Sequence, residues 1–167
     1  MALVDRTGPI LDRWVAVTDA EPITPRTSVI VTPKRLNAEG EALFRTGAQI
    51  GVFLPSDAKI EDLAQVAARL GLIGLRFAAM KDGRPFTLGR ILRTRMAFKG
   101  ELRAVGEIIP DQVPFLVRCG FTTFEVPEAF SMPAMRRALS YYAHHYQRPA
   151  ANDRPVFELR RAGGPHP

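Results

Sequence analysis

Compact apolar runs and amphipathic segments alternate along the chain from residue 51 onwards. Apolar runs bounded by turn residues predict four strands, at residues 51–54, 72–79, 102–107 and 121–126. The helical spacing of apolar residues predicts a helix after each strand, at residues 57–70, 88–98, 110–119 and 131–146. Because the strands are apolar on both faces, as buried parallel strands are, we expect an α/β fold of four consecutive βα units. Their parallel sheet forms either a half-barrel or a small open sheet.

The pattern before residue 51 is less regular. Residues 1–12 read as a poorly ordered lead-in. Two β-branched runs, at 14–17 and 28–31, are separated by a proline-rich turn. They predict an N-terminal β-hairpin arm at residues 13–31. A short amphipathic helix is expected to follow at 34–45.

Length and composition are those of one ordinary globular domain. The chain has 167 residues, of which 46% are hydrophobic and 24% are charged. We expect a single domain at residues 1–147 and a loosely ordered tail at 148–167, which is rich in Pro, Arg and Gly. No apolar run approaches the roughly 20 residues that span a bilayer, and the first residues lack a signal-peptide core. These features predict a cytoplasmic protein with no membrane partner.

The sequence offers no cysteine or histidine set for a metal. Cys119 is the only cysteine, so one chain has neither a disulfide nor a thiolate cluster. His144 and His145 are neighbours on an expected helix and therefore point in different directions. We expect no metal and no cofactor. Cys119 is interpreted as a buried small apolar residue, with a reactive thiol as the alternative.

Positive charge is concentrated between residues 76 and 103. This window holds eight Lys and Arg residues against Asp82 and Glu101, an excess of six, and the net charge of the whole chain is also +6. The excess lies in a strand-helix-strand segment and not on a tail. It therefore favours a local anion site or a protein-docking face, and makes nucleic-acid binding the weaker alternative.

The carboxyl edge of the expected sheet is where ligands bind in such folds. Lys81 and Arg84 would flank the start of a helix there, where backbone N–H groups favour an anion, and Asp82 lies between them in a turn. Glu107 and Asp111 follow the next strand and are the candidates for acid/base catalysis.

The helix expected at 88–98 places its arginines in different environments. Arg90 and Arg93 lie opposite the apolar stripe, where they are either solvated or docked to an acidic partner. Arg95 falls within the stripe, so it either bonds carbonyls of the last turn or forms a buried pair with Glu101 or Glu107; we favour a structural pair with Glu101. The predicted anion- or partner-binding set comprises Lys81, Asp82, Arg84, Arg90, Arg93 and Arg103.

A half-barrel leaves exposed apolar edges. Unpaired strand edges and apolar surface favour association with a second copy. We therefore expect a homodimer.

Short motifs in the same stretch resemble a known family. They are Asp82-Gly83-Arg84, Arg90 with Leu92-Arg93 and Arg95, Gly100-Glu101-Leu102-Arg103-Ala104, Gly106, Asp111-Gln112 and Arg118-Cys119-Gly120-Phe121. The pattern is similar to that of a bacterial domain of unknown function whose genes typically lie beside that of the assimilatory sulfite reductase haemoprotein. Its members are often labelled oxidoreductases of sulfite reduction. This chain departs from the pattern at Thr87-Leu88-Gly89-Arg90, where a glycine inside a helix costs about 1 kcal/mol relative to alanine.

The resemblance implies an accessory protein of assimilatory sulfite reduction that presents a basic surface to sulfite reductase, to another sulfur-assimilation protein or to a small oxyanion. The residues supply no redox motif, so an oxidoreductase role is implied by the resemblance alone. The alternatives are a (β/α) enzyme acting on a sulfate- or phosphate-bearing small molecule, and nucleic-acid binding through the basic segment.

Overall fold

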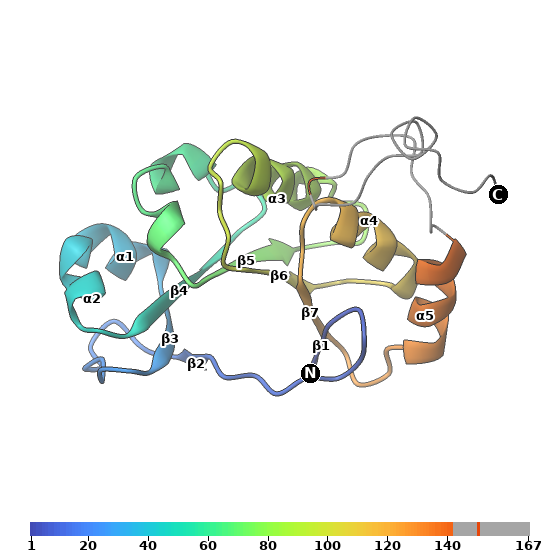
Figure 1. Ribbon diagram of the computed structural model, residues 1–167, viewed down its shortest axis with the longest axis horizontal. Helices are drawn as coiled ribbons and strands as arrows, with labels where there is room; N and C mark the ends of the chain where they lie inside the picture. The colour runs from blue at the N-terminus through green and yellow to red at the C-terminus, as the bar shows by residue number, and fades with distance from the viewer. Residues whose placement is uncertain (142–149, 151–167) are drawn as a thin grey trace, which may run out of the picture.

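A seven-stranded sheet, curled into a half-barrel, forms the centre of the molecule in the computed structural model, which describes residues 1–141 and 150 (Figure 1). The strand order is β1-β7-β6-β5-β4-β3-β2, and every neighbouring pair is parallel except β1 with β7. The strands are β1 (Ala2–Val4), β2 (Val15–Ala16), β3 (Ser28–Val31), β4 (Gln49–Leu54), β5 (Leu72–Phe77), β6 (Glu101–Gly106) and β7 (Thr123–Val126). The predicted α/β class with a largely parallel sheet is confirmed.

The helices α1 to α4 lie on one side of this sheet (Figure 1). The α-helices are α1 (Pro33–Glu39), α2 (Glu41–Arg45), α3 (Arg84–Thr94), α4 (Val113–Arg118) and α5 (Met132–Tyr141). Short 3-10 turns complete the connections: η1 (Ile60–Leu63), η2 (Ala67–Arg69) and η3 (Pro110–Gln112). Within the described residues, no helix has the length and apolar character needed to cross a bilayer.

Alternation along the strands divides the sheet into two faces. On β5, Ile73, Leu75 and Phe77 join the main core under the helices, whereas Leu72 belongs to a small second cluster with Trp14 and Ile30. The main core therefore lies between the sheet and its helices. The opposite, helix-free face has to be covered by another part of the chain.

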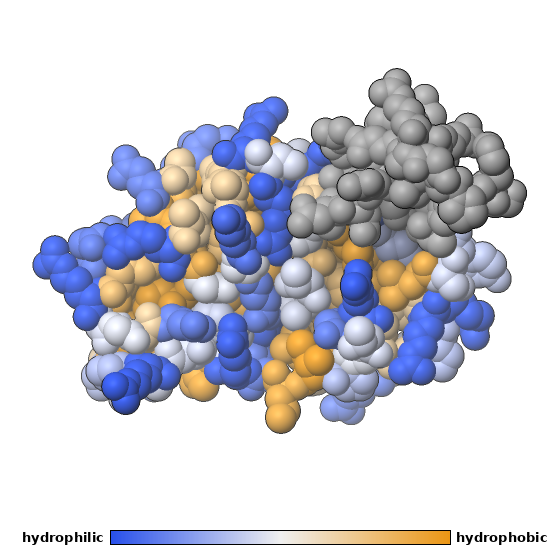
Figure 2. Space-filling model, viewed as in Figure 1, coloured by the Kyte–Doolittle hydropathy of each residue, from blue (hydrophilic) through white to orange (hydrophobic). Residues whose placement is uncertain are grey.

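The N-terminal segment covers part of that helix-free face. Because β1 and β2 lie at opposite edges of the sheet, the chain between them must cross its width. Residues 10–14, the N-terminal strap, bring Trp14 against Gly51 and Gly71, where the ring lies in the space that a side chain would need. The strap also leaves apolar surface, because Leu11 is 96% exposed. Figure 2 shows an apolar patch at the lower edge, where the N-terminal segment runs.

Three predictions about the N-terminal half of the fold are wrong. The hairpin arm at 13–31 does not form, because β2 pairs with β3 in parallel, and an antiparallel hairpin would reverse it. Residues 1–12 are not merely a lead-in, because β1 pairs with β7. The βα units are not regular either, since η1 and η2 replace the helix expected at 57–70. The buried apolar residues Ile60, Leu63, Ala67 and Leu70 keep the spacing of an α-helix, so this spacing does not account for the 3-10 turns.

Gly89 illustrates how packing overrides helix propensity. A Cβ built on Gly89 of α3 would lie 2.6 Å from Cε2 of Phe121 and 3.3 Å from Cδ2 of Leu102, both buried. Alanine would improve helix propensity by about 1 kcal/mol, but overpacking a core typically costs about 1–3 kcal/mol. We expect Gly89→Ala to lower the free energy of unfolding in urea denaturation. A more stable variant would show that the Phe121 ring can move aside at little cost in free energy.

The tail predicted at 148–167 lies, apart from Ala150, outside the described residues. The domain boundary at residue 147 lies there too.

Candidate anion- and partner-binding site

The loop after β5 and Ser56 in the loop after β4 meet at the carboxyl edge of the sheet. Asp82 and Arg84 form a two-point ion pair: Nε of Arg84 donates to Oδ1 of Asp82 and Nη2 donates to Oδ2, both at 2.9 Å. Nη2 of Arg84 also donates to Oγ of Ser56 at 2.8 Å. We call Ser56, Lys81, Asp82 and Arg84 the rim. The structure thus brings together Ser56, Asp82 and Arg84 from two successive βα connections, and Lys81 precedes Asp82 in the second.

Asp82 is the more buried member of the ion pair. Its side chain is 9% exposed, whereas that of Arg84 is 61% exposed. Arg84 and, to a smaller extent, the Ser56 hydroxyl hold the pKa of Asp82 well below its usual range. Asp82 is therefore ionised at neutral pH and offsets much of the charge of Arg84.

The start of α3 also faces Asp82. The N-cap residue, Gly83, has no side chain to accept the first N–H groups, and Oδ1 of Asp82 accepts the backbone N–H of Arg84 at 3.2 Å. A carboxylate already lies at the positive end of this helix. An external anion would have to compete with it.

Arg93 has a structural role that the helical pattern did not reveal. Its Nε donates to the carbonyl of Gly120 at 2.9 Å, and its Nη1 donates to the carbonyls of Phe98 and Gly100 at 2.7 and 2.8 Å. Gly120 has φ +95°, and a Cβ there would lie 2.4 Å from Cγ of Arg93. Burial lowers the pKa of Arg93. Arg93 therefore holds the end of α3 against the segment that leads into β6 and against the turn after α4, and it is not a solvated residue.

Arg103 lies on the helix-free face, only 1% exposed, and not at the rim. Nη1 and Nη2 donate to the two carboxylate oxygens of Asp12 at 2.6 and 2.8 Å, and Nη2 donates to Oε1 of Glu101 at 2.9 Å. Glu101 also accepts from Nε1 of Trp14 and from the hydroxyl of Thr123, at 2.9 and 2.7 Å. Burial alone would lower the pKa of Arg103, but Asp12 and Glu101 outweigh burial and raise it.

The predicted structural pair of Arg95 with Glu101 is wrong. Arg95 is exposed at the C-cap of α3, and the buried arginine beside Glu101 is Arg103. Helical spacing placed Arg95 in the apolar stripe, but α3 ends at Thr94 and the chain turns at Ala97, where φ is +52°. The periodicity therefore no longer applies at that position.

The two candidates for acid/base chemistry are exposed. Glu107 and Asp111 follow β6, and the described contacts of Glu107 are those of its backbone, which donates to the carbonyl of Phe77. Gln112, between Asp111 and α4, donates from Nε2 to the carbonyl of Met80 at 2.9 Å. Among the described residues, no group of three or more His, Cys, Asp or Glu side chains comes together as a metal site.

Cys119 is buried at the end of α4, as predicted. Burial raises the pKa of its thiol, although Arg90 and Arg118 act in the opposite direction. A raised pKa lowers the fraction of thiolate at neutral pH. This finding favours the structural interpretation of Cys119.

Lys81 and Arg90 remain as exposed cations of the predicted set. Within residues 1–141 and Ala150, neither side chain makes an ion pair or a side-chain hydrogen bond. The sequence reasoning missed Asp12 and Trp14, which complete the network around Arg103. The available signal was the single tryptophan of the chain, Trp14, at the start of the expected hairpin arm and two residues after Asp12.

The family model described as bacterial protein of unknown function (DUF934) matches residues 51–157. No curated protein matches the chain.

Proposed function

We propose, for a chain that belongs to the DUF934 family of bacterial proteins of unknown function, a role as an accessory protein of assimilatory sulfite reduction. In this proposal the chain docks on an acidic surface of a sulfur-assimilation protein, and the sulfite reductase haemoprotein is the first partner to test. The pathway rests on the gene neighbourhood typical of the family that the motifs resemble. The docking surface rests on the structure.

One observation supports the docking surface. The basic stretch holds several arginines, but Arg93 and Arg103 are bound by carbonyls and carboxylates inside the fold. Lys81, in the loop before α3, and Arg90, within α3, are instead exposed, and among the described residues neither side chain makes an ion pair. Cations without a structural role are available to bind an acidic partner. Such charges raise the rate of association with the partner more than the intrinsic affinity for it.

A charge-reversal experiment tests this docking surface. We expect Lys81→Glu combined with Arg90→Glu to weaken binding to immobilised sulfite reductase haemoprotein by at least about tenfold in 50 mM salt, mainly through the association rate. The matched control is Arg136→Glu with Arg137→Glu, two exposed cations on α5. Biolayer interferometry of all three proteins gives both rate constants.

Two results would contradict the proposal. Absence of binding by the wild-type protein would remove the haemoprotein as the partner. Equal losses in the Lys81/Arg90 and the Arg136/Arg137 variants would show that only net charge matters, and would remove α3 as the docking surface.

The expected homodimer is a second proposal about partners. Its support is the exposed apolar side chains of the N-terminal part, among them Leu11 and Val15, the latter on the edge strand β2. Sedimentation equilibrium of the purified protein gives its mass directly. We expect a dimer in the wild type and a shift toward monomer in Leu11→Ser with Val15→Ser.

A further inference from the structure

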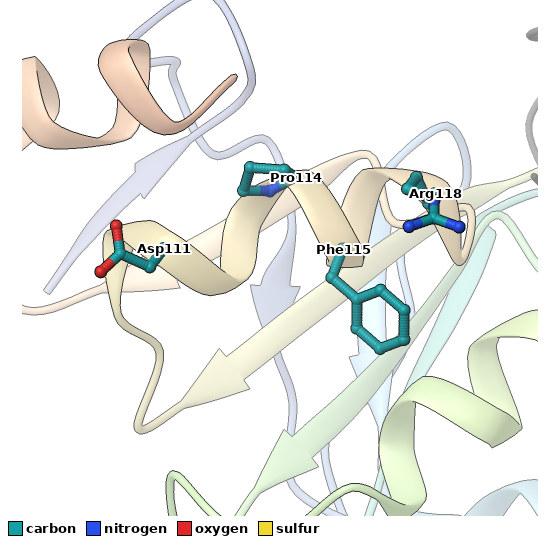
Figure 3. Close-up of a pocket in the computed structure, with 4 residues that line it drawn as sticks. All are labelled: Asp111, Pro114, Phe115 and Arg118. Carbon is teal, nitrogen blue, oxygen red and sulfur yellow. The ribbon is translucent and has the colours of Figure 1, made fainter. Parts of the chain in front are cut away.

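A pocket of about 180 Å³ lies along η3 and α4, separate from the rim. The described residues that line it are Asp111, Pro114, Phe115 and Arg118, spaced so that they share one side of the helical segment. Figure 3 shows Asp111 at one end of this row and the Arg118 guanidinium at the other, with Pro114 and Phe115 between them.

Arg118 is the unusual member of the pocket. Its Nε is buried and has no hydrogen-bond partner, the only such side-chain atom found among the described residues. A buried, charged N–H group without an acceptor destabilises a folded protein, and each instance needs an explanation. One explanation is that a ligand supplies the missing acceptor. A guanidinium presents parallel N–H groups that match an oxyanion.

Phe115 provides an apolar surface beside the guanidinium. The residue is 46% exposed, which is high for a phenylalanine in the middle of a helix. The ring packs on Phe86 of α3 at a centroid distance of 4.7 Å, and Cζ of Arg118 lies 5.7 Å from its centroid. The ring is thus held by a neighbour while much of its surface stays open. This arrangement suits a flat apolar group.

Charge further limits the ligand. Arg118 supplies the positive charge at one end of the pocket. Asp111 is exposed at the other end, about 10 Å away for seven helical residues. A second negative charge on the ligand would be repelled there. The volume is also below the roughly 300–1,000 Å³ of sites for drug-sized molecules.

We propose that this pocket binds a small organic monoanion, in which a carboxylate or sulfonate accepts hydrogen bonds from Arg118 and a flat apolar body lies against Phe115 and Pro114. The proposal does not depend on the docking role of α3. Its key residues, Phe115 and Arg118, are not among those reversed in the docking experiment. The two proposals can therefore fail separately.

The probes are benzenesulfonate and benzoate, with neutral benzamide as the control, titrated into the full-length protein. The readout is the NMR resonance of the Arg118 Nε–H group, assigned by its loss in Arg118→Met. We expect saturable shifts with both anions and none with benzamide. Absence of a saturable shift with either anion, or an equal response to benzamide, would overturn the proposal.

Variants separate binding from folding. Isothermal titration calorimetry should show that Arg118→Met weakens benzenesulfonate binding by at least tenfold and that Phe115→Ser also weakens it, whereas the control Arg137→Met on α5 leaves it unchanged. Arg118→Met should unfold at the same temperature as the wild type or higher, because it removes an unsatisfied buried donor. A clearly lower unfolding temperature would assign Arg118 a structural role and overturn the proposal, as would unchanged affinity.

Discussion

Replacement of Arg103 by alanine is expected to lower the free energy of unfolding by about 3–5 kcal/mol, the usual effect of removing one member of a buried ion pair. Arg103 is 1% exposed and pairs with both Asp12 and Glu101. The substitution leaves the half-buried carboxylate of Glu101 without its cation and the N-terminal strap without its ionic contact. It also removes a large side chain from a closely packed face.

Urea denaturation followed by circular dichroism measures this change. The matched control is Arg76→Ala, because Arg76 is exposed and lies on the same face of the neighbouring strand β5. We expect the control to change stability by less than about 0.5 kcal/mol. If the two variants were equally stable, the buried network would contribute nothing measurable to the fold.

The network of Asp12, Glu101 and Arg103 also predicts how the stability of the protein depends on pH. The hydrogen bonds from Arg103 lower the pKa of Asp12 in the folded state below its usual value near 3.8, and they outweigh burial, which acts in the opposite direction; the backbone N–H of Trp14 lowers the pKa further. A depressed folded-state pKa stabilises the protein at pH values above the unfolded-state pKa, and this contribution is lost as pH falls through the folded-state pKa. Unfolding between pH 5 and pH 2 should therefore be less pH-dependent in Asp12→Asn than in the wild type. Identical acid profiles would contradict the role of Asp12.

Trp14→Ala is expected to have an effect of similar size, a loss of about 3–5 kcal/mol. Trp14 is 6% exposed, and its ring occupies space above two glycines: a Cβ on Gly71 would lie 2.7 Å from Cη2 of Trp14, and one on Gly51 would lie 3.2 Å from Cζ3. Truncation leaves a cavity that the glycines cannot fill. It also removes the indole N–H that donates to Glu101 at 2.9 Å.

Trp14→Phe is the matched control for this prediction. Phenylalanine keeps most of the apolar surface but has no N–H, so we expect about half of the loss seen with alanine. Thermal and urea unfolding of both variants give the values. A Trp14→Ala variant as stable as the wild type would show that the strap does not cover the sheet in solution.

The parallel strands β4 to β7 could be predicted from sequence because the residues that specify each strand lie within it or next to it in the chain. The apolar runs that became β4 to β7 are short and bounded by glycines, prolines or charged turns. Pro110 begins the segment that forms η3 and α4, and Gly120 follows its end. Such patterns depend only on neighbours a few residues away. The buried state of Cys119 followed in the same way from its place at the end of an apolar helix.

The N-terminal half could not be predicted in this way because its order depends on distant partners. Residues 2–4 become a strand only by pairing with β7, more than 100 residues later. Asp12 and Trp14 become ordered by contact with Arg103 and Glu101, about 90 residues away. β2 has only two residues, too few to show the alternation of apolar and polar side chains that identifies a strand. The sequence around it therefore did not indicate whether β2 runs parallel or antiparallel to β3.

The candidate site shows the same division. The sequence by itself determined that arginines gather between residues 76 and 103 and that Asp82 and Arg84 flank a tight turn, because composition and turn chemistry are local properties. Only the tertiary structure decided the use of each charge. Arg93 is bound by three carbonyls, Arg103 by two carboxylates from different segments, and Arg90 is left to solvent. The interaction energy of a charge depends on its burial and on its nearest partner in space, and sequence spacing specifies neither.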